Sequence, residues 1–401
     1  MRIRILVLLV SSFVLSAVFG AARIAPRDVS LQAPDGVTLK ATYYSAANPG
    51  PGILLLHMCN SDRRAWSTLA PKLAAAGFHV LALDYRGYGE SGGERSQDGQ
   101  QQQTIMNQKW PGDVDAAFSY LTAQPGVDGK RIGAAGASCG VDQSIQLAIR
   151  HQEVRTLALL SGNTNSRGRE FLRNAAGLPL FAAASEDDGD VLPYLRWLLS
   201  LSGSPSRLME FKTAGHGTDM FAVEKDLEPQ IVRWFEEHLK GAPAQPPSRA
   251  AATKSKTPNP VSDLWDALAQ PGGVARAVGL YRDAKKRDPK LYFFPETEMN
   301  ALGYEKLQAG DLEDAVELFK LNVEAYPNSA NVYDSLADGY VATGDRELAI
   351  QFSEKTLEML RTNPPANAQF AAAIRQSAEQ KLRNLRGGPS TGAGAPPPQV
   401  P

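Results

Sequence analysis

The chain has 401 residues, of which 43% are hydrophobic and 21% are charged, and its formal net charge is −1. At about 150 residues per domain, this length predicts two or three domains. The balance of 42 Lys and Arg against 43 Asp and Glu gives no overall basic field, so we expect no nucleic-acid partner. Two cysteines are too few for a disulfide scaffold or a cysteine-rich zinc module, and they allow at most one bridge.

The first 22 residues have the pattern of a secretory signal peptide. Arg2 and Arg4 precede an apolar run over residues 5–19, and the small residues 20–22 follow. A basic start, an apolar run and a small-residue exit are the three parts of such a signal. An uncleaved membrane anchor is the alternative, because residues 5–22 reach the lower length limit of a spanning helix. We expect cleavage and export to the periplasm or the extracellular space, with membrane attachment only if the segment stays uncleaved.

Residues 23–240 alternate short apolar runs with amphipathic ones. In chain order, strands are predicted at 52–57, 79–85, 131–137, 154–161, 178–184 and 207–211, and helices at 65–76, 110–123, 141–149 and 228–239. Residues 38–44 alternate apolar and polar side chains after a turn at 34–36, as in an antiparallel hairpin at the edge of a sheet. Unbroken apolar strands separated by helices predict an α/β fold with a doubly wound, mostly parallel sheet.

A G-x-S-x-G motif at residues 136–140 lies between a predicted strand and a predicted helix. The motif alone is a weak signal in a chain rich in Gly, Ala and Ser, where a glycine-rich turn is the simpler interpretation. Its position strengthens it, because a nucleophilic serine needs a sharp strand-to-helix turn whose flanking glycines let backbones approach closely. The start of the following helix also offers backbone N–H groups to a developing oxyanion. Ser138 is therefore the candidate nucleophile.

Together with the strand at 53–57, residues 59–61 and the segment 83–91, this motif resembles the α/β-hydrolase superfamily, and its dienelactone-hydrolase-like branch most closely. The resemblance covers about residues 35–240. It implies the chain order nucleophile, acid, histidine, and it requires no metal and no organic cofactor. The dienelactone hydrolases proper carry a cysteine where this chain has Ser138, so their substrate is not implied.

The histidine and the acid follow from this order. Of the five histidines, only His216 comes after both the serine and an acidic cluster, in a glycine-flanked loop that follows a strand. In the family, the acid stands three residues past a small residue at the end of a strand, and counting from Ser185 gives Asp188. Asp187 is one residue away and could take the role with a small shift in register. The alternative is that His216 is not a general base and only forms structural hydrogen bonds within its loop.

The resemblance also places the oxyanion donors at the backbone amides of Cys139 and Cys59. Family members usually carry His-Gly where this chain has His57-Met58, which leaves the geometry of that loop open. If both amides donate to one oxyanion, the two backbones must lie within several ångström of each other. Because these are the only cysteines of a chain expected to be exported, we predict a Cys59–Cys139 disulfide, with two independent buried thiols as the alternative.

Beyond residue 240 the composition changes. Residues 241–260 are rich in Pro, Ala, Ser and Lys and predict a flexible linker, and residues 387–401 predict a disordered tail. Between them, residues 261–386 contain a 34-residue period in which Leu, Gly, Asp and Ala recur in register: Leu302, Gly310, Asp311 and Ala315 return as Leu336, Gly344, Asp345 and Ala349. This period resembles the tetratricopeptide repeat, an all-α helical-repeat domain, and implies binding of a protein or peptide.

These features predict an exported serine hydrolase that acts on a small-molecule ester or amide, most simply a carboxylic ester, through Ser138, His216 and Asp188. A non-catalytic binding protein that keeps the hydrolase fold as a scaffold, and a serine peptidase with the same triad, are the alternatives. The short interval between Ser161 and Leu178 leaves no room for a large cap domain. We therefore expect residues 92–111, with a solvated loop at the glutamine run 100–103, to control access to the site.

Overall fold

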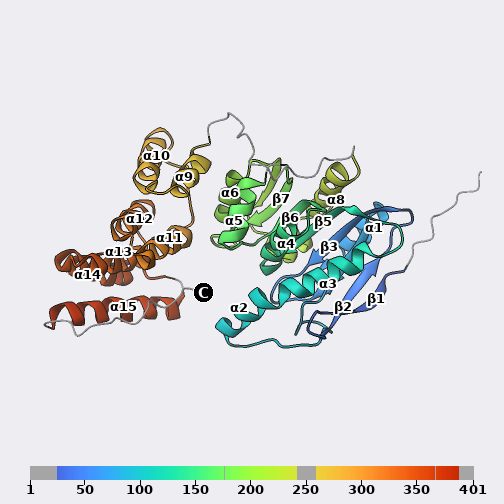
Figure 1. Cartoon of the computed structure of the whole chain (residues 1–401), viewed down its shortest axis with the longest axis horizontal. Helices are drawn as coiled ribbons and strands as arrows, with labels where there is room; N and C mark the ends of the chain where they lie inside the picture. Colours follow the sequence, from blue (N-terminus) through green and yellow to red (C-terminus); the bar gives the residue numbers. More distant parts are fainter. Residues whose placement is uncertain (1–24, 176, 242–258, 366, 388–401) are drawn as a thin grey trace, which may run out of the picture.

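The computed structural model describes residues 25–175, 177–241, 259–365 and 367–387. They form a sheet-containing part up to residue 241 and an all-helical part from residue 259 (Figure 1). The predicted signal peptide at 1–22, and all but the edges of the predicted linker and tail, lie outside the described residues. Among the described residues, no helix combines the length and the hydropathy needed to cross a membrane.

The sheet has eight strands in the order β1-β2-β4-β3-β5-β6-β7-β8. Their bounds are β1 Arg27–Gln32, β2 Thr38–Tyr44, β3 Gly50–Leu56, β4 His79–Leu83, β5 Val127–Ala137, β6 Val154–Leu160, β7 Leu180–Ser185 and β8 Ser206–Phe211. β2 pairs antiparallel with β1 and β4, as the alternating pattern of residues 38–44 predicts. All other pairs are parallel.

Helices cover both faces of this sheet. They are α1 Leu69–Ala75, α2 Gly99–Gln108, α3 Trp110–Thr122, α4 Cys139–Arg150, α5 Ser166–Asn174, α6 Val191–Leu201, α7 Met220–Val223 and α8 Leu227–Leu239. In β3, Leu54 and Leu56 belong to the core that contains α3 and α4, whereas Ile53 and Leu55 belong to the core that contains α1 and α8. A strand that is buried on both faces needs apolar side chains at successive positions, which explains the unbroken apolar runs in the sequence. The predicted doubly wound α/β fold, followed by an all-helical region, is confirmed.

The glutamine run differs from its prediction. Residues 100–103 lie in α2 rather than in a loop. The Asp98 side chain accepts a hydrogen bond from the Gln101 amide and caps the helix, and a run without glycine, proline or β-branched residues has good helix propensity. Residues 99–108 of the segment expected to control access are therefore a helix.

The second part contains α9 Pro260–Leu268, α10 Val274–Arg287, α11 Glu296–Ala309, α12 Leu312–Ala325, α13 Ala330–Thr343, α14 Arg346–Thr362 and α15 Ala368–Arg386. The recurring glycine has a local reason, because Gly310 and Gly344 end α11 and α13 with φ of +85° and +80°, the left-handed conformation that suits glycine. Gly303 allows close helix packing, since a Cβ there would lie 2.4 Å from the Phe319 ring. The tetratricopeptide assignment itself stays a prediction.

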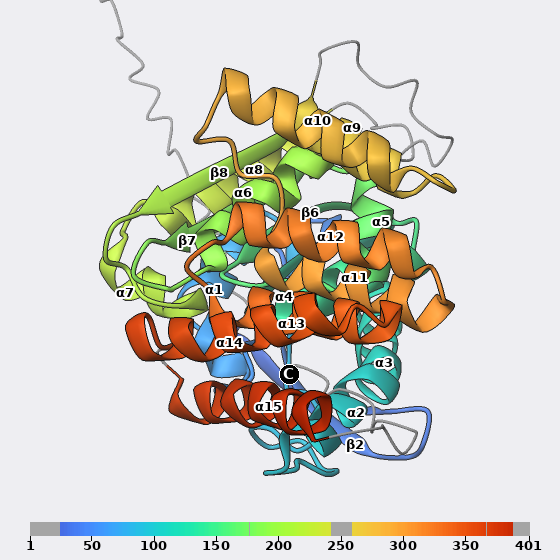
Figure 2. The ribbon, with the colours of Figure 1, turned by 90° about the vertical axis from the view of Figure 1, so that its left-hand side faces the viewer.

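The helical part stands against α5 and α6 at one end of the sheet-containing part (Figure 1). Seen from that side, its helices follow one another from α9 and α10 to α15 across this end (Figure 2). Trp197 and Trp265 join the two parts with ring centroids 5.3 Å apart, and Asn259 Nδ2 donates to the Ser200 carbonyl at 2.6 Å. Arg169 Nη1 also donates to Glu298 Oε1 at 2.9 Å across the contact. Aromatic packing and ion pairs therefore hold the helical part in place.

Candidate active site

The predicted site residues all follow strands whose carboxyl ends lie at one edge of the sheet. Cys59 follows β3, Ser138 follows β5, Asp188 follows β7 and His216 follows β8. Because these strands run parallel within the sheet, their final residues meet at the same edge. Residues separated by up to 157 positions in the chain are thereby brought to one place.

Ser138 occupies a strained turn between β5 and α4. Its backbone has φ 53° and ψ −120°, a conformation that non-glycine residues rarely adopt. The flanking glycines make the turn possible, because a Cβ at Gly136 would lie 2.0 Å from the Gly140 carbonyl oxygen and one at Gly140 would lie 2.2 Å from that of Leu56. Strain at a single polar residue, kept in place by close backbone contacts, is typical of functional positions.

His216 and Asp188 form a pair. Nδ1 of the imidazole lies 2.8 Å from each carboxylate oxygen of Asp188. Asp187 has a different partner, because its Oδ1 accepts the Gly215 amide at 3.3 Å. A hydrogen bond from Ser185 is the main reason that the pKa of Asp187 lies below its ordinary value. The sequence left open whether Asp188 or Asp187 pairs with the histidine. In the structure Asp188 contacts the imidazole, and Asp187 accepts a hydrogen bond from the backbone of the histidine loop.

The histidine loop lies against the residue that precedes the serine. A Cβ at Gly217 would be 3.4 Å from Cβ of Ala137 and 3.0 Å from Sδ of Met58. Among the hydrogen bonds of the described residues, none joins Ser138 Oγ to His216 Nε2. Such contacts are often long in hydrolases without substrate and shorten in the reacting complex.

Met58 stands where the family usually has glycine, and its side chain is packed away under the histidine loop. It is buried, and Thr218 Oγ1 approaches its sulfur at 3.7 Å. His57, directly before it, is also buried; its Nδ1 lies 2.7 Å from the Met58 carbonyl oxygen, and its Nε2 accepts the Tyr85 amide at 3.2 Å. Burial lowers the pKa of His57, so the ring is neutral and donates through Nδ1. His57 thus helps to position the loop that carries Cys59.

Cys59 and Cys139 are joined by a disulfide, with their Cα atoms 5.8 Å apart. Cys139 is the first residue of α4, so its amide has no acceptor within the helix. The disulfide therefore ties the loop after β3 to the residue that follows Ser138. The two predicted donor amides are connected covalently through their own side chains.

Residues 47–186 match the family described as serine aminopeptidase, S33. The matched segment includes Cys59 and Ser138 and ends before Asp188 and His216. An uncharacterized protein of Mycobacterium tuberculosis is 33% identical over 128 residues, which are 31% of this chain and 42% of that protein. The chain thus spans about two fifths of the length of the first curated relatives that it matches.

Among solved structures, the chain is similar to an esterase of Pyrococcus furiosus at 17% identity and a TM-score of 0.43, covering 54% of this chain and 93% of that one. It is similar to a dienelactone hydrolase of Anabaena variabilis at 18% identity and a TM-score of 0.43, covering 53% of this chain and 99% of that one. The hydrolase part of the predicted resemblance agrees with the family match of residues 47–186, and that match does not address the repeat assignment.

We expect the disulfide to contribute strongly to stability. Its cysteines are 80 residues apart, and closing a loop of that size removes about 4.5 kcal/mol of chain entropy from the unfolded state. Replacing both residues (C59A with C139A) should lower the free energy of unfolding by an amount of this order, measured by urea titration. Reductant should destabilise the wild type and leave the double variant unchanged. Mass spectrometry that finds both thiols free in unreduced protein would contradict the pairing.

The side chains over the disulfide were not identifiable from the sequence. Met106 of α2 places its sulfur 3.9 Å from Cys59 Sγ. Arg95 lies over the Tyr88 ring, with its guanidinium carbon 4.3 Å from the ring centroid, and one of its nitrogens is 3.5 Å from the Cys59 carbonyl oxygen. Arg95 and Met106 of the segment 92–111, which was expected to control access, therefore lie at Cys59. No motif marks Met106 or Arg95, because only the fold brings their segments to the disulfide.

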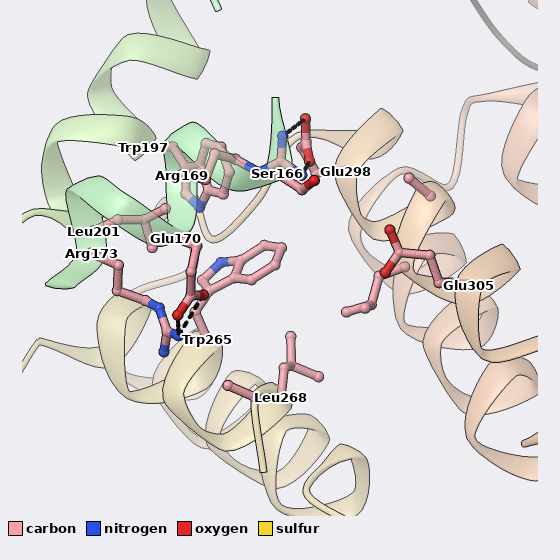
Figure 3. Close-up of a pocket in the computed structure, with 13 residues that line it drawn as sticks. Ser166, Arg169, Glu170, Arg173, Trp197, Leu201, Trp265, Leu268, Glu298 and Glu305 are labelled. Atoms are coloured by element: carbon pink, nitrogen blue, oxygen red, sulfur yellow. Dashed lines mark hydrogen bonds and ion pairs between the residues drawn. The ribbon is translucent and has the colours of Figure 1, made fainter. Parts of the chain in front are cut away.

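Two cavities of the structure lie outside the candidate residues Ser138 and His216. One, of about 760 Å³, is bordered by Met58 and Thr218 on one side and by Lys72 and Glu228 on the other. Another, of about 180 Å³, lies between the two parts of the chain (Figure 3). Neither is lined by Ser138 or His216. In the described part of the chain, no group of three or more His, Cys, Asp or Glu residues could hold a metal ion.

The helical part also reaches the loop that carries the acid. Asp190, two residues after Asp188, occupies the N-cap position of α6 without a capping hydrogen bond from its side chain. Burial raises the pKa of Tyr292 to about 12, and the negative charge of Asp190 adds to this effect. The segment just before α11 is therefore close enough to the loop of Asp188 and Asp190 to interact with it electrostatically.

Proposed function

We propose that this chain is a serine hydrolase that cleaves a carboxylic ester through Ser138, His216 and Asp188, with an acyl-enzyme intermediate. The observation that carries the proposal is the His216–Asp188 pair, with Nδ1 2.8 Å from the carboxylate, at the sheet edge where Ser138 occupies its strained turn. A serine, a histidine that can accept its proton and a carboxylate that orients the histidine are the three groups of nucleophilic acyl transfer.

In the first half-reaction, Ser138 Oγ attacks the carbonyl carbon while its proton moves to Nε2 of His216. Asp188 accepts the Nδ1–H hydrogen bond and stabilises the imidazolium that forms. The carbonyl π electrons move onto oxygen, and collapse of this tetrahedral intermediate expels the alkoxide, which takes the proton from His216. Water then attacks the acyl-enzyme by the same route and releases the acid.

The negative oxygen of the intermediate would be bound by the backbone amides of Cys59 and Cys139. The amino-terminal end of α4 adds positive potential at the same point. One oxyanion donor typically contributes about 3 kcal/mol to transition-state stabilisation. A disulfide between the two donor residues limits their relative motion, which favours a preorganised oxyanion hole.

Amide hydrolysis is a second candidate, because the family matched by residues 47–186 is described as an aminopeptidase. The same triad serves both reactions, so the substrate pocket decides between them. Comparing a nitrophenyl ester with an aminoacyl nitroanilide separates the two. We expect the ester to be the better substrate, and a higher kcat/KM for the nitroanilide would assign the chain as a peptidase.

We further propose that residues 1–22 direct export and that the helical part binds a protein or peptide. Export is supported by the signal pattern and by the paired cysteines, since disulfides persist in oxidising compartments. Partner binding is supported by the 34-residue period and by the helix pairs that it predicts. Measurement of the mature amino terminus in material collected outside the cytoplasm tests the first of these proposals.

Labelling with a fluorophosphonate tests the central proposal. The probe reacts with an activated serine, so we expect a single adduct on the peptide that contains Ser138, and none after heat denaturation. Mass spectrometry locates the adduct. Ester turnover without label on Ser138 would exclude it as the nucleophile, and the absence of both label and turnover would favour the non-catalytic scaffold.

A further inference from the structure

The cavity of about 180 Å³ between the two parts has walls of different origin (Figure 3). The α5 and α6 helices of the sheet-containing part and the α9 and α11 helices of the helical part all contribute residues to its lining. Trp197, Leu201, Trp265 and Leu268 supply aromatic and aliphatic surface. Cavities at domain boundaries that combine apolar walls with a few polar groups are preferred positions for ligands.

The charges around this cavity do not balance. Arg169 pairs with Glu298, and Arg173 pairs with Glu170 and Asp266. Glu305 of α11 also lines the cavity, and no cation of the described residues lies within ion-pair distance of its carboxylate. Burial raises the pKa of Glu298, and the negative charge of Glu305 adds to this effect. Two arginines thus stand beside four carboxylates, and the carboxylate of the exposed Glu305 has no cationic partner among the described residues.

The aromatic wall faces the same space. Figure 3 shows the ring of Trp265 extending into the cavity from one side and the carboxylate of Glu305 directed into it from the other. The Trp265 ring is already fixed, because its Nε1 donates to the Phe293 carbonyl at 3.1 Å and the ring packs on Trp197. The face of an indole attracts cations, and a carboxylate opposite it adds Coulomb attraction.

We propose that this cavity binds an organic cation with an apolar stem, either a small ammonium compound or a lysine or arginine side chain of a protein partner. The cationic head would lie between Trp265 and Glu305, and the stem would contact Leu201 and Leu268. A volume of about 180 Å³ is enough for several waters at about 30 Å³ each, and so for a head of this size. This site is separate from Ser138, and the inference does not depend on the proposed hydrolysis.

Calorimetric titration of the full chain tests this inference. The probes are choline, its neutral isostere 3,3-dimethyl-1-butanol, and Nα-acetyl-lysine amide. We expect at least one cation to bind at least about tenfold more tightly than the neutral alcohol, because only a cation gains the attraction of Glu305. Because the walls belong to both parts of the chain, the bound cation should also raise the unfolding midpoint.

The variant E305Q should lose the preference for cations about tenfold, and Trp265→Leu should weaken all cations. The matched control is E347Q, since Glu347 is an exposed glutamate of α14 outside the cavity, and it should bind like the wild type. Tighter binding of choline indicates a small ammonium ligand, and tighter binding of the lysine derivative indicates a partner's side chain. Equal binding of cation and neutral alcohol, no cation binding at tens of millimolar, or equal effects of E305Q and E347Q would overturn the inference.

Discussion

Replacing Ser138 by alanine is expected to lower kcat for a nitrophenyl ester by roughly 10⁴- to 10⁶-fold, because the proposed acyl-enzyme forms on the hydroxyl that the substitution removes. The substitution removes one oxygen from a residue whose backbone is held by its neighbours, so the fold should be retained. Steady-state kinetics, together with the circular dichroism spectrum and the unfolding midpoint, separates lost chemistry from lost structure. KM should change little, since binding contacts away from the serine remain.

Ser161 provides a matched control. It also ends a strand of the sheet, is buried and has positive φ, but its hydroxyl makes no hydrogen bond within the described residues. Ser161→Ala should therefore leave kcat within about threefold of the wild type. Equal losses in the two variants would mean that any disturbance of this edge stops turnover, and Ser138 would no longer be distinguished as the nucleophile.

Replacing Asp188 by asparagine should lower kcat by about 10³- to 10⁴-fold while leaving the structure intact. An amide in place of the carboxylate can hold the imidazole in the tautomer whose Nε2 carries the proton, and that tautomer cannot accept the proton of Ser138. The imidazolium of the transition state also loses its counter-charge. Fluorophosphonate labelling of Ser138 should slow in parallel, because it too requires removal of the serine proton.

Asp187→Asn is the control for this prediction. Asp187 accepts the Gly215 amide, and an asparagine oxygen can do the same, so we expect less than about a tenfold loss of kcat. A larger loss for Asp187→Asn than for Asp188→Asn would exchange the roles of the two carboxylates. Asp187, the alternative that the sequence left open, would then be the residue that orients the imidazole.

Much of the fold could be predicted because its signals are local. The continuous apolar runs of β3, β6 and β7 follow from burial on both sheet faces, and the alternation of residues 38–44 follows from a strand with only one fully buried face in the antiparallel hairpin at the sheet edge. The motif around Ser138 could be identified because close backbone contacts restrict its flanking positions to glycine. The helix at residues 99–108 was missed, since its glutamines have no apolar periodicity and only its propensity and the Asp98 cap favour it.

Sequence patterns alone indicate the residue types of the candidate site and their order along the chain, because a strand-to-helix turn and a glycine-flanked loop each require particular residues within a few positions. They could not choose between Asp187 and Asp188, since a shift of one residue in a loop changes which carboxylate meets the imidazole. They also did not indicate where the side chain of Met58 points, which residues of α2 cover the disulfide, or that Glu305 and Trp265 share a cavity. These features depend on distances between segments far apart in the chain, and only the packing of the tertiary structure sets those distances.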